Sequence, residues 1–472
     1  MKIRGREVQK VHVMGIGGTA MSAIAGLLRD AGCEVRGSDA GRPYPPVSDL
    51  LDRLGIPVMY PYSPSNLAWG PDLVVVGNVI RKTNEEAVAA TGLVCMAMPE
   101  LLREAFLQTR RSLVIAGTHG KTTTTSLVAH LLHAQGMDPS FLVGGIPLNF
   151  GTNYRLGGGG VFVIEGDEYD TAYFDKRPKF MHYAPWAAII NNIEFDHADI
   201  FRDLDSVVAA FKGFAGLLPR GAPLVVPAND PVIERAVAES PARIVTFGLK
   251  AGDYRPANCV FEAGRVRFSL VRHGAVVGDF DSPLLGEHNL KNTVAALALL
   301  METGHATPAL ADALSSFRGV RKRQEVKGVA GGVTVIDDFA HHPTAVRETI
   351  RAVRMGWPKA RVIALFEPES NTSRRAVFQR EYALAFSNAD EVLFYKPLEK
   401  PDNLRPEERI NMEQLCADIA ALGVRARMIP DIARLAEEAA ALARPGDVIL
   451  GMSGRDFLGV HDLVIQRLKK AA

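Results

Sequence analysis

The segment at residues 117–125 combines glycines, a lysine and threonines in an arrangement suited to phosphate binding. Gly117 and Gly120 would let the backbone turn its N–H groups toward a phosphate, and the following helix adds the positive end of its dipole. Lys121 would reach the β- and γ-phosphates, and the Thr122 hydroxyl would bind Mg²⁺. The loop is shorter than the usual P-loop, because Ile115 stands where that pattern has its first glycine. The predicted nucleotide-binding residues here are Gly117, Thr118, His119, Gly120, Lys121, Thr122 and Thr123.

The threonines at residues 122–125 strengthen this interpretation. Each threonine costs a helix about 0.6 kcal/mol relative to alanine, so four in succession at a helix start are unusual. A hydroxyl-rich helix cap without a ligand is the alternative. Phosphate binding explains the run better, because it uses the hydroxyls.

Two polar segments each follow a predicted strand further along the chain. Residues 165–170 are rich in carboxylates, and residues 191–197 end in His197. The carboxyl ends of parallel strands are where open α/β sheets bind ligands, and Mg²⁺ prefers a few carboxylates with phosphate oxygens and water. An isolated acidic run is more often a solvated loop, and a single histidine is more often a structural hydrogen bonder. Beside a phosphate loop, both segments are expected to contribute to a site.

A glycine-rich segment near the N-terminus, residues 15–20, fits the pattern G-x-G-x-x-A, and Asp39 stands at the end of the next predicted strand. Alone, this pattern favours a nicotinamide-dependent dehydrogenase. A substrate that carries a nucleoside diphosphate satisfies the same features. It is the simpler interpretation in a chain that already has an ATP site.

Two further segments have polar residues in suitable places. Residues 286–292 open a helix, where the amides could contact a purine, although capping by Asn289 is an equal alternative. Residues 337–343 follow a predicted strand. His341 and His342 have no cysteine or glutamate at zinc-ligand spacing, so a zinc site is rejected.

Strands alternate with helices throughout, which predicts an α/β fold of parallel, helix-covered sheets. A strand, a glycine turn and a helix begin the chain, and strands restart after residue 108 and after the basic residues 318–323. At 472 residues the chain exceeds a single hydrophobic core. We predict three domains: residues 1–107, 108–321 and 322–472.

The composition narrows the classes of function. The 54 basic and 53 acidic residues nearly cancel, so a general nucleic-acid binder is disfavoured. The N-terminus lacks the apolar core of a signal peptide, and no apolar run approaches the roughly 20 residues of a membrane span. The four scattered cysteines indicate reduced thiols. We expect a cytoplasmic protein without an obligate protein partner.

In this order, these segments resemble the Mur ligases of bacterial cell-wall synthesis over essentially the whole chain. They are residues 15–18, 117–125, 167–168, 192–197, 286–292 and 337–343. The resemblance implies a Rossmann-like N-terminal domain for a UDP-sugar, a central P-loop ATPase-like α/β domain and a Rossmann-like C-terminal domain. It also implies an ATP-dependent amide ligase, in which ATP phosphorylates the substrate carboxylate and an amine attacks the acyl phosphate.

The resemblance also implies roles by motif position. Lys121 would hold the phosphates, with Lys121, Glu168 and His197 as the catalytic set, and Thr122, Glu168 and His197 would serve the magnesium sites. Asn289 and Asn292 would meet adenine, Asp338 the ATP ribose and Arg323 the phosphates. The UDP-sugar residues would be Gly15, Gly17, Gly18 and Asp39.

Two branches of the family accept UDP-N-acetylmuramate: one adds L-alanine, and one adds the recycled wall tripeptide L-alanyl-γ-D-glutamyl-meso-diaminopimelate. Residues 168–177, 192–201 and 366–375 resemble the tripeptide branch, with Arg374 and Arg375 as candidate peptide-binding residues. Glu369 departs from the basic residue expected there, and Lys212 is left out of the site. The L-alanine branch, and a P-loop nucleotide switch or binding protein, remain alternatives.

Overall fold

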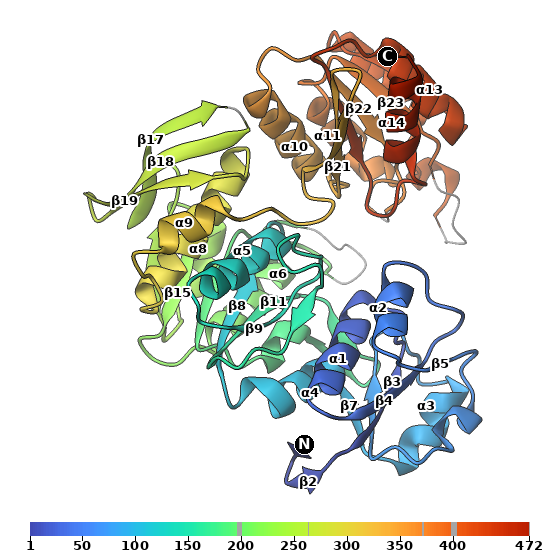
Figure 1. The fold of residues 1–472 in the computed structure, drawn as a ribbon, viewed down its shortest axis with the longest axis vertical. Coiled ribbons are helices and arrows are strands. Elements are labelled where there is room, and N and C mark those ends of the chain that lie inside the picture. The colour runs from blue at the N-terminus through green and yellow to red at the C-terminus, as the bar shows by residue number, and fades with distance from the viewer. Residues whose placement is uncertain (196–200, 263, 371, 398–403, 472) are drawn as a thin grey trace. The chain divides into compact units, whose positions relative to one another are not determined.

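The computed structural model describes residues 1–195, 201–262, 264–370, 372–397 and 404–471 (Figure 1). The chain divides into two compact units. Unit 1 comprises residues 1–257, 270–278 and 291–317, and unit 2 comprises residues 258–269, 279–290 and 318–472. The division passes through a group of three strands, described below.

The N-terminal part of unit 1 contains a parallel five-stranded sheet in the order β5-β4-β3-β6-β7. Strand β6 is apolar and fully buried, and every residue of β3 except Lys10 is buried, which is typical of a sheet covered on both faces. The elements, preceded by the hairpin β1 (Lys2–Ile3) and β2 (Arg6–Glu7), are β3 (Lys10–Met14), α1 (Thr19–Asp30), β4 (Glu34–Ser38), α2 (Val47–Arg53), β5 (Val58–Met59), β6 (Leu73–Val76), α3 (Glu85–Ala89), β7 (Cys95–Ala97) and α4 (Met98–Leu102).

A second sheet follows, in the order β10-β9-β11-β8-β14-β15-β16-β17-β18-β19. Strands β9, β11, β8, β14, β15 and β16 run parallel, so their carboxyl ends meet at one edge. The strands are β8 (Arg111–Ala116), β9 (Ser140–Leu142), β10 (Tyr154–Arg155), β11 (Val161–Gly166), β14 (Ala187–Ile190), β15 (Pro223–Pro227), β16 (Arg243–Phe247), β17 (Tyr254–Glu262), β18 (Arg265–Arg272) and β19 (Ala275–Ser282). The helices are α5 (Lys121–Ala134), α6 (Leu204–Ala215), α7 (Pro231–Val237), α8 (Glu287–Glu302) and α9 (Leu310–Ser315), and the hairpin β12 (Asp170–Ala172) and β13 (Asp175–Pro178) lies outside the sheet.

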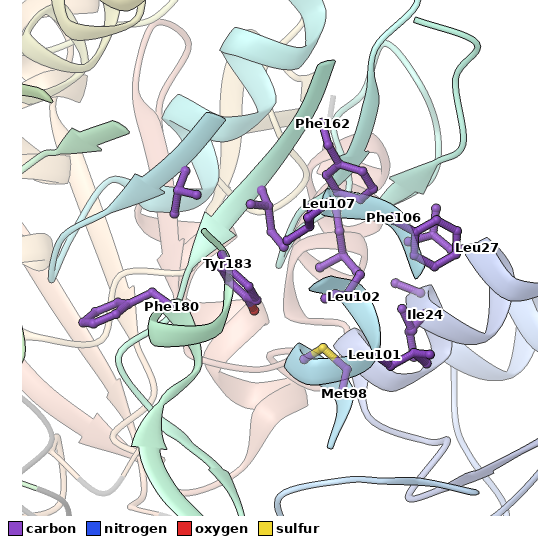
Figure 2. Close-up of a cluster of buried hydrophobic side chains, with 14 of the residues drawn as sticks. Ile24, Leu27, Met98, Leu101, Leu102, Phe106, Leu107, Phe162, Phe180 and Tyr183 are labelled. Atoms are coloured by element: carbon purple, nitrogen blue, oxygen red, sulfur yellow. The ribbon is translucent and has the colours of Figure 1, made fainter. Parts of the chain in front are cut away.

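One hydrophobic core connects the first two sheets within unit 1. Figure 2 shows Ile24 and Leu27 of α1 near the side chains of α4 and of the short helical segment η3 (Arg103–Leu107). Phe106 of η3 lies 6.4 Å from Phe162 of β11, between ring centroids. The linker near residue 108 is therefore packed against both sheets.

Unit 2 contains a six-stranded sheet in the order β20-β21-β25-β22-β23-β24. Strand β20 is antiparallel to β21, and the other neighbours are parallel. One face packs on α10, α11 and α12, and the other packs on α13 and α14. The elements are β20 (Glu325–Ala330), β21 (Val333–Asp338), α10 (Pro343–Gly356), β22 (Val362–Phe366), α11 (Gln379–Ala385), β23 (Glu391–Tyr395), α12 (Met412–Ala421), β24 (Arg425–Ile429), α13 (Ile432–Leu442), β25 (Val448–Met452) and α14 (Val460–Ala471).

The predicted α/β fold with three sheet-forming parts is confirmed. The exact boundaries at 107/108 and 321/322 stay predictions. In the part of the chain that the structure describes, no helix is both long and apolar enough to cross a bilayer.

Candidate active site

The predicted phosphate loop lies between β8 and α5, as expected. Gly117 and Gly120 have φ angles of +132° and +81°, which residues with a Cβ rarely adopt. A Cβ at Gly120 would lie only 2.7 Å from Oδ1 of Asn292. The positive φ angles therefore favour glycine at both positions, and at Gly120 a Cβ would also displace the Asn292 amide.

Lys121 and Glu168 are brought together at this loop. The Lys121 ammonium lies 2.8 Å from Oε2 of Glu168 and donates to the carbonyl oxygen of Gly117 at 2.6 Å. The Glu168 side chain is 3% exposed, so this ion pair is largely shielded from water. The positive charge is thereby held at the mouth of the loop, beside the helix N-terminus, where a phosphate would bind.

Glu165, near the end of β11, is a further acidic residue of this site. Its Oε1 accepts a hydrogen bond of 2.8 Å from the Thr122 hydroxyl, and its Oε2 accepts one of 2.6 Å from the backbone N–H of Gly144. The sequence placed Glu165 in an acidic run but singled out only Glu168. The signal that identifies Glu165 is the register between β11 and β8. Glu165 pairs with Ile115, two residues before the phosphate loop begins, and therefore lies beside the loop.

Burial and charge act in opposite directions on these groups. Burial works to lower the pKa of Lys121, but the neighbouring carboxylates, Glu168 first, outweigh it and raise the pKa above its ordinary value. Burial raises the pKa of Glu165, although the charge of Lys121 and the hydrogen bonds that Glu165 accepts from Gly144 and Thr122 oppose the shift. Lys121 and Glu165 are half-buried and Glu168 is buried, so interactions among these charges are stronger than in water.

The segment after β14 supports the loop from the other side. The backbone N–H of His119 donates to Oδ1 of Asn192 at 2.8 Å, and the N–H of Glu194 donates to the Thr118 hydroxyl at 2.9 Å. This segment leads directly to His197. His197 lies outside the described residues, so its predicted role stays a prediction.

The two predicted adenine-contacting amides lie in the first turns of α8. Asn292 lies against Gly120 of the loop. The amide of Asn289 donates to the carbonyl oxygen of Leu285 at 2.9 Å. Helix α8 begins at Glu287, so Asn289 lies in its first turn and is not the N-cap residue.

The glycine-rich N-terminal segment also has the predicted geometry. It joins β3 to α1, with Gly15 at a φ of +78°. Asp39 accepts hydrogen bonds from the backbone N–H of Gly17 at 2.8 Å and of Ala40 at 2.7 Å. Gly15, Gly17 and Asp39 therefore lie together, with the Asp39 carboxylate bound to the turn itself; Gly18 completes the turn as the residue before α1.

Asp338 lies in unit 2, at the end of β21. It is 5% exposed, and it accepts hydrogen bonds from the backbone N–H groups of Gln324 at 2.7 Å and Ala340 at 2.8 Å. Burial raises the pKa of this carboxyl, and Arg323 opposes the shift. The Arg323 guanidinium lies 4.8 Å from the ring centroid of Phe339. Arg323 and Asp338 are thus close neighbours, and their predicted roles, the phosphates for Arg323 and the ribose for Asp338, stay predictions.

The two candidate peptide-binding arginines differ in burial. Arg374 is 3% exposed, whereas Arg375 is half-buried. The alternative that both side chains are solvated is wrong for Arg374. Glu369 is also buried, with its carboxylate near Gly454 and His341.

The residues around the phosphate loop suit a magnesium ion in donor chemistry. Thr122 and Glu168 supply hydroxyl and carboxylate oxygens beside the loop, and Mg²⁺ prefers such ligands together with phosphate oxygens. Among the described residues, no group of three His, Cys, Asp or Glu side chains forms a metal site. That finding does not include His197, the third predicted ligand.

Three family models match this chain in succession. They are described as Mur ligase family, catalytic domain (residues 10–110), Mur ligase middle domain (115–300), and Mur ligase, glutamate ligase domain (322–455). Together they match most of the chain, and each contains one of the three groups of site residues described above.

Whole-length relatives agree with these models. The chain is 38% identical over 468 residues to the UDP-N-acetylmuramate–L-alanyl-γ-D-glutamyl-meso-2,6-diaminoheptandioate ligase of Escherichia coli, covering 98% of this chain and 99% of that protein. The crystal structure of a murein peptide ligase from Psychrobacter arcticus has a TM-score of 0.70 and 31% identity, over 98% of this chain and 99% of that one. A UDP-N-acetylmuramate–alanine ligase from Thermotoga maritima has a TM-score of 0.79 and 25% identity, over 98% and 100%.

Proposed function

Because this chain belongs to the Mur ligase family of ATP-dependent amide ligases, we propose that it joins UDP-N-acetylmuramate to L-alanyl-γ-D-glutamyl-meso-diaminopimelate. The observation that carries the substrate assignment is the 38% identity, along nearly the whole chain, to the E. coli ligase of that name. The reaction would return recycled wall peptide to peptidoglycan synthesis. We place it in the cytoplasm, with no nucleic acid, membrane or obligate protein partner.

The geometry of the phosphate loop supports the ATP-dependent half of this proposal. We assign ATP phosphates to the backbone N–H groups of the loop and to Lys121, whose charge would offset the charge on the transferred phosphoryl group. Phosphoryl transfer needs mainly positioning and charge stabilisation. A buried lysine held by carboxylates at a helix N-terminus supplies both.

We propose Mg²⁺ as the cofactor, held by Thr122, Glu168 and His197. When bound, the ion would neutralise charge on the ATP phosphates. Glu165 holds the Thr122 hydroxyl by the 2.8 Å hydrogen bond and so orients one of these ligands. A group that orients a metal ligand is commonly as necessary as the ligand itself.

The substrate-binding residues are proposed from their positions in the three sheet-forming parts. Gly15, Gly17, Gly18 and Asp39 surround the turn before α1, where the UDP-sugar diphosphate would meet a helix N-terminus. Asn289, Asn292, Arg323 and Asp338 would contact the nucleoside and phosphates of ATP. Arg374 and Arg375 would bind carboxylates of the incoming peptide.

The second candidate is ligation of L-alanine to UDP-N-acetylmuramate. The structural similarity to the Thermotoga alanine ligase favours it. Both candidates share ATP, the sugar nucleotide and the phosphate loop. They differ only in the amine, so the choice depends on the peptide-binding residues of unit 2.

A phosphate-release assay with omitted components tests the proposal. Purified protein, ATP, Mg²⁺, UDP-N-acetylmuramate and tripeptide should release phosphate, and omission of the sugar nucleotide or of the amine should abolish the release. Steady ATP hydrolysis without either substrate would favour a nucleotide switch instead. Binding of NADH in a fluorescence titration, in place of UDP-N-acetylmuramate, would favour a dehydrogenase.

A further inference from the structure

A fully buried carboxylate, Glu86 of α3, lies within the N-terminal sheet region. Its Oε1 is 2.7 Å from Nε2 of His12 and accepts a hydrogen bond from the Ser38 hydroxyl. Its Oε2 accepts hydrogen bonds from the backbone N–H of Ser63 at 3.0 Å and from the Asn66 amide at 2.7 Å. Both Glu86 and His12 are 0% exposed. One carboxylate therefore connects a helix, two strands and a loop.

The charge of this group is retained in the folded protein. Burial works to raise the pKa of Glu86, but the hydrogen bonds from its four partners outweigh it, and the pKa lies below its ordinary value. An ionised carboxylate is costly to bury unless it is fully hydrogen-bonded. Its four hydrogen-bond partners meet that requirement at Glu86.

The segments that Glu86 holds are those that surround the glycine-rich turn. Ser38 directly precedes Asp39, which accepts the hydrogen bond from the N–H of Gly17. Ser63 directly follows Tyr62, and a Cβ at Gly15 would lie 3.9 Å from the Tyr62 hydroxyl. Burial first, and then the nearby charges of Asp39 and Glu86, raise the pKa of the Tyr62 hydroxyl, which places this hydroxyl close to Asp39. Both chains of contacts from Glu86 thus converge on the same turn.

We propose that Glu86 is a positioning residue for the nucleoside diphosphate substrate: it holds Asp39 and Tyr62 in place around the turn without contacting the ligand. The inference rests on the proposed function, which places the UDP-sugar at this turn. A side chain that holds the residues lining a binding site in place raises the affinity of the site for its ligand, here the UDP-sugar. It has no reason to act on the ATP loop, which belongs to another sheet.

The substitution Glu86→Gln tests this with little change in shape. Each carboxylate oxygen faces two partners, and those at Oε2 are both donors. The glutamine NH₂ group replaces one of these oxygens and cannot accept a hydrogen bond. The contacts at that position, either with His12 and Ser38 or with Ser63 and Asn66, therefore weaken. Glu85→Gln is the matched control, because Glu85 precedes Glu86 on α3 and is exposed.

Affinity for UDP-N-acetylmuramate and for UDP is measured by calorimetric titration, and kcat and the KM for ATP by phosphate release. We expect Glu86→Gln to raise both Kd values about tenfold. The KM for ATP, and kcat at saturating substrates, should stay within twofold of wild type. The control Glu85→Gln should change none of these values. Unchanged Kd values, or equal weakening of ATP, would overturn the inference. Calorimetry measures binding of UDP-N-acetylmuramate independently of catalysis. If the wild-type protein binds this ligand but does not catalyse ligation, the result counts against the proposed function and not against the role of Glu86.

Asn66→Ala keeps the test decisive if Glu86→Gln does not fold. It removes one of the four hydrogen bonds to Glu86 from a half-buried position in the 3₁₀ helix η1 (Pro64–Leu67), together with the Asn66 hydrogen bond to the carbonyl oxygen of Pro61. The expected effect has the same sign and is smaller, about threefold in the Kd for UDP-N-acetylmuramate. An unchanged Kd in this variant would equally refute the role of the network.

Discussion

Lys121 is the side chain on which the phosphate loop depends most directly, since its ammonium is buried among carboxylates beside a helix N-terminus. If it stabilises charge on the transferred phosphoryl group, Lys121→Ala should cost about 3 kcal/mol of transition-state stabilisation, or about 10²-fold in kcat/KM for ATP. The measurement is phosphate release at saturating sugar nucleotide and amine. Lys176→Ala is the control, because Lys176 is 69% exposed and should be silent. Near-normal turnover in a folded Lys121→Ala protein would contradict the assignment.

Glu165 gives the site a predictable response to pH. Burial raises the pKa of this carboxyl, so it takes up a proton at a higher pH than an exposed glutamate. If the ionised form orients Thr122, activity should fall as the pH decreases through the raised pKa and should be fully present above it. Glu165→Gln, which mimics the protonated form, should lower kcat/KM for ATP about tenfold at neutral pH. In a plot of activity against pH, Glu165→Gln should also remove the fall in activity that Glu165 causes on the acid side. If that fall is unchanged in the variant, Glu165 is not its cause.

Residue types and local order were enough to predict the loop, but not the partners within it. The positions of Gly117, Gly120 and Lys121 follow from a local pattern, and the structure has them as expected. Glu168 was selected from its acidic run by resemblance. Glu165 was not, because its importance depends on which side chain of β11 points toward Thr122. Such a choice is made by strand register between segments about fifty residues apart, which no local pattern contains.

At the scale of elements, the hairpin β12–β13 begins two residues after Glu168 and is stabilised by an ion pair between two of its own side chains. Arg177 donates to both oxygens of Asp175, at 3.0 and 2.7 Å. These hydrogen bonds lower the pKa of Asp175 to about 2, although partial burial opposes the shift. The carboxylate therefore stabilises the folded state in full above its unfolded pKa of about 4, and this stabilisation is lost as the pH falls toward 2.

Asp175→Asn should accordingly lower the thermal unfolding midpoint at pH 7. The cost should be about 1 kcal/mol after allowance for solvent screening of the exposed arginine. The difference from wild type should shrink when the same measurement is made below pH 4. Asp205→Asn, which removes an exposed ion pair with Arg235, is expected to have no measurable effect at either pH. A constant difference at all pH values would show that the carboxylate charge is not responsible.

Some of the parallel strands could be predicted from sequence because they are short, apolar and bounded by glycine or acidic turns, whereas β5, β7, β9, β15, β16 and β24 were not predicted. Predicted strands at 187–190 and 362–366 coincide with β14 and β22. The antiparallel edge strand β20 was not predicted. Its sequence, EVKGVA, has no apolar run, and most of its residues are exposed or half-buried, with Val326 49% and Val329 64% exposed. Edge strands are defined by their neighbour more than by their own residues.

At the scale of the whole molecule, the three repeats of strand, turn and helix predicted three sheets, and the three sheets are present. The packing between the first two was beyond sequence reasoning. It depends on apolar side chains of α1, α4 and η3 that meet Phe162 from a distant strand (Figure 2). Individually these residues are ordinary core positions. Only the fold shows that they make one continuous core, which explains why the first sheet and the strands β8–β11 and β14–β16 of the second belong to the same compact unit.

The choice of amine substrate belongs to the same scale, because it concerns the molecule's place in metabolism. L-Alanine offers one carboxylate, whereas the tripeptide offers several anionic groups and can contact more than one basic side chain. Arg374 and Arg375 follow β22 in unit 2, and each charged hydrogen bond to a carboxylate contributes about 1.5–3 kcal/mol. A single contact of this kind separates the two amines by at least about tenfold.

We therefore expect kcat/KM for the tripeptide to exceed that for L-alanine by at least about tenfold at saturating ATP and UDP-N-acetylmuramate. Arg375→Ala should reduce this preference, because Arg375 is half-buried and open to a ligand, without changing the KM for ATP. Arg434→Ala is the matched control: it removes a largely exposed arginine of the same unit, and its partner Glu438 keeps a second ion pair with Arg427. Preference for L-alanine would refute the tripeptide assignment and favour the alanine ligase. An undiminished preference in Arg375→Ala would leave the substrate assignment intact and remove this arginine from the peptide site.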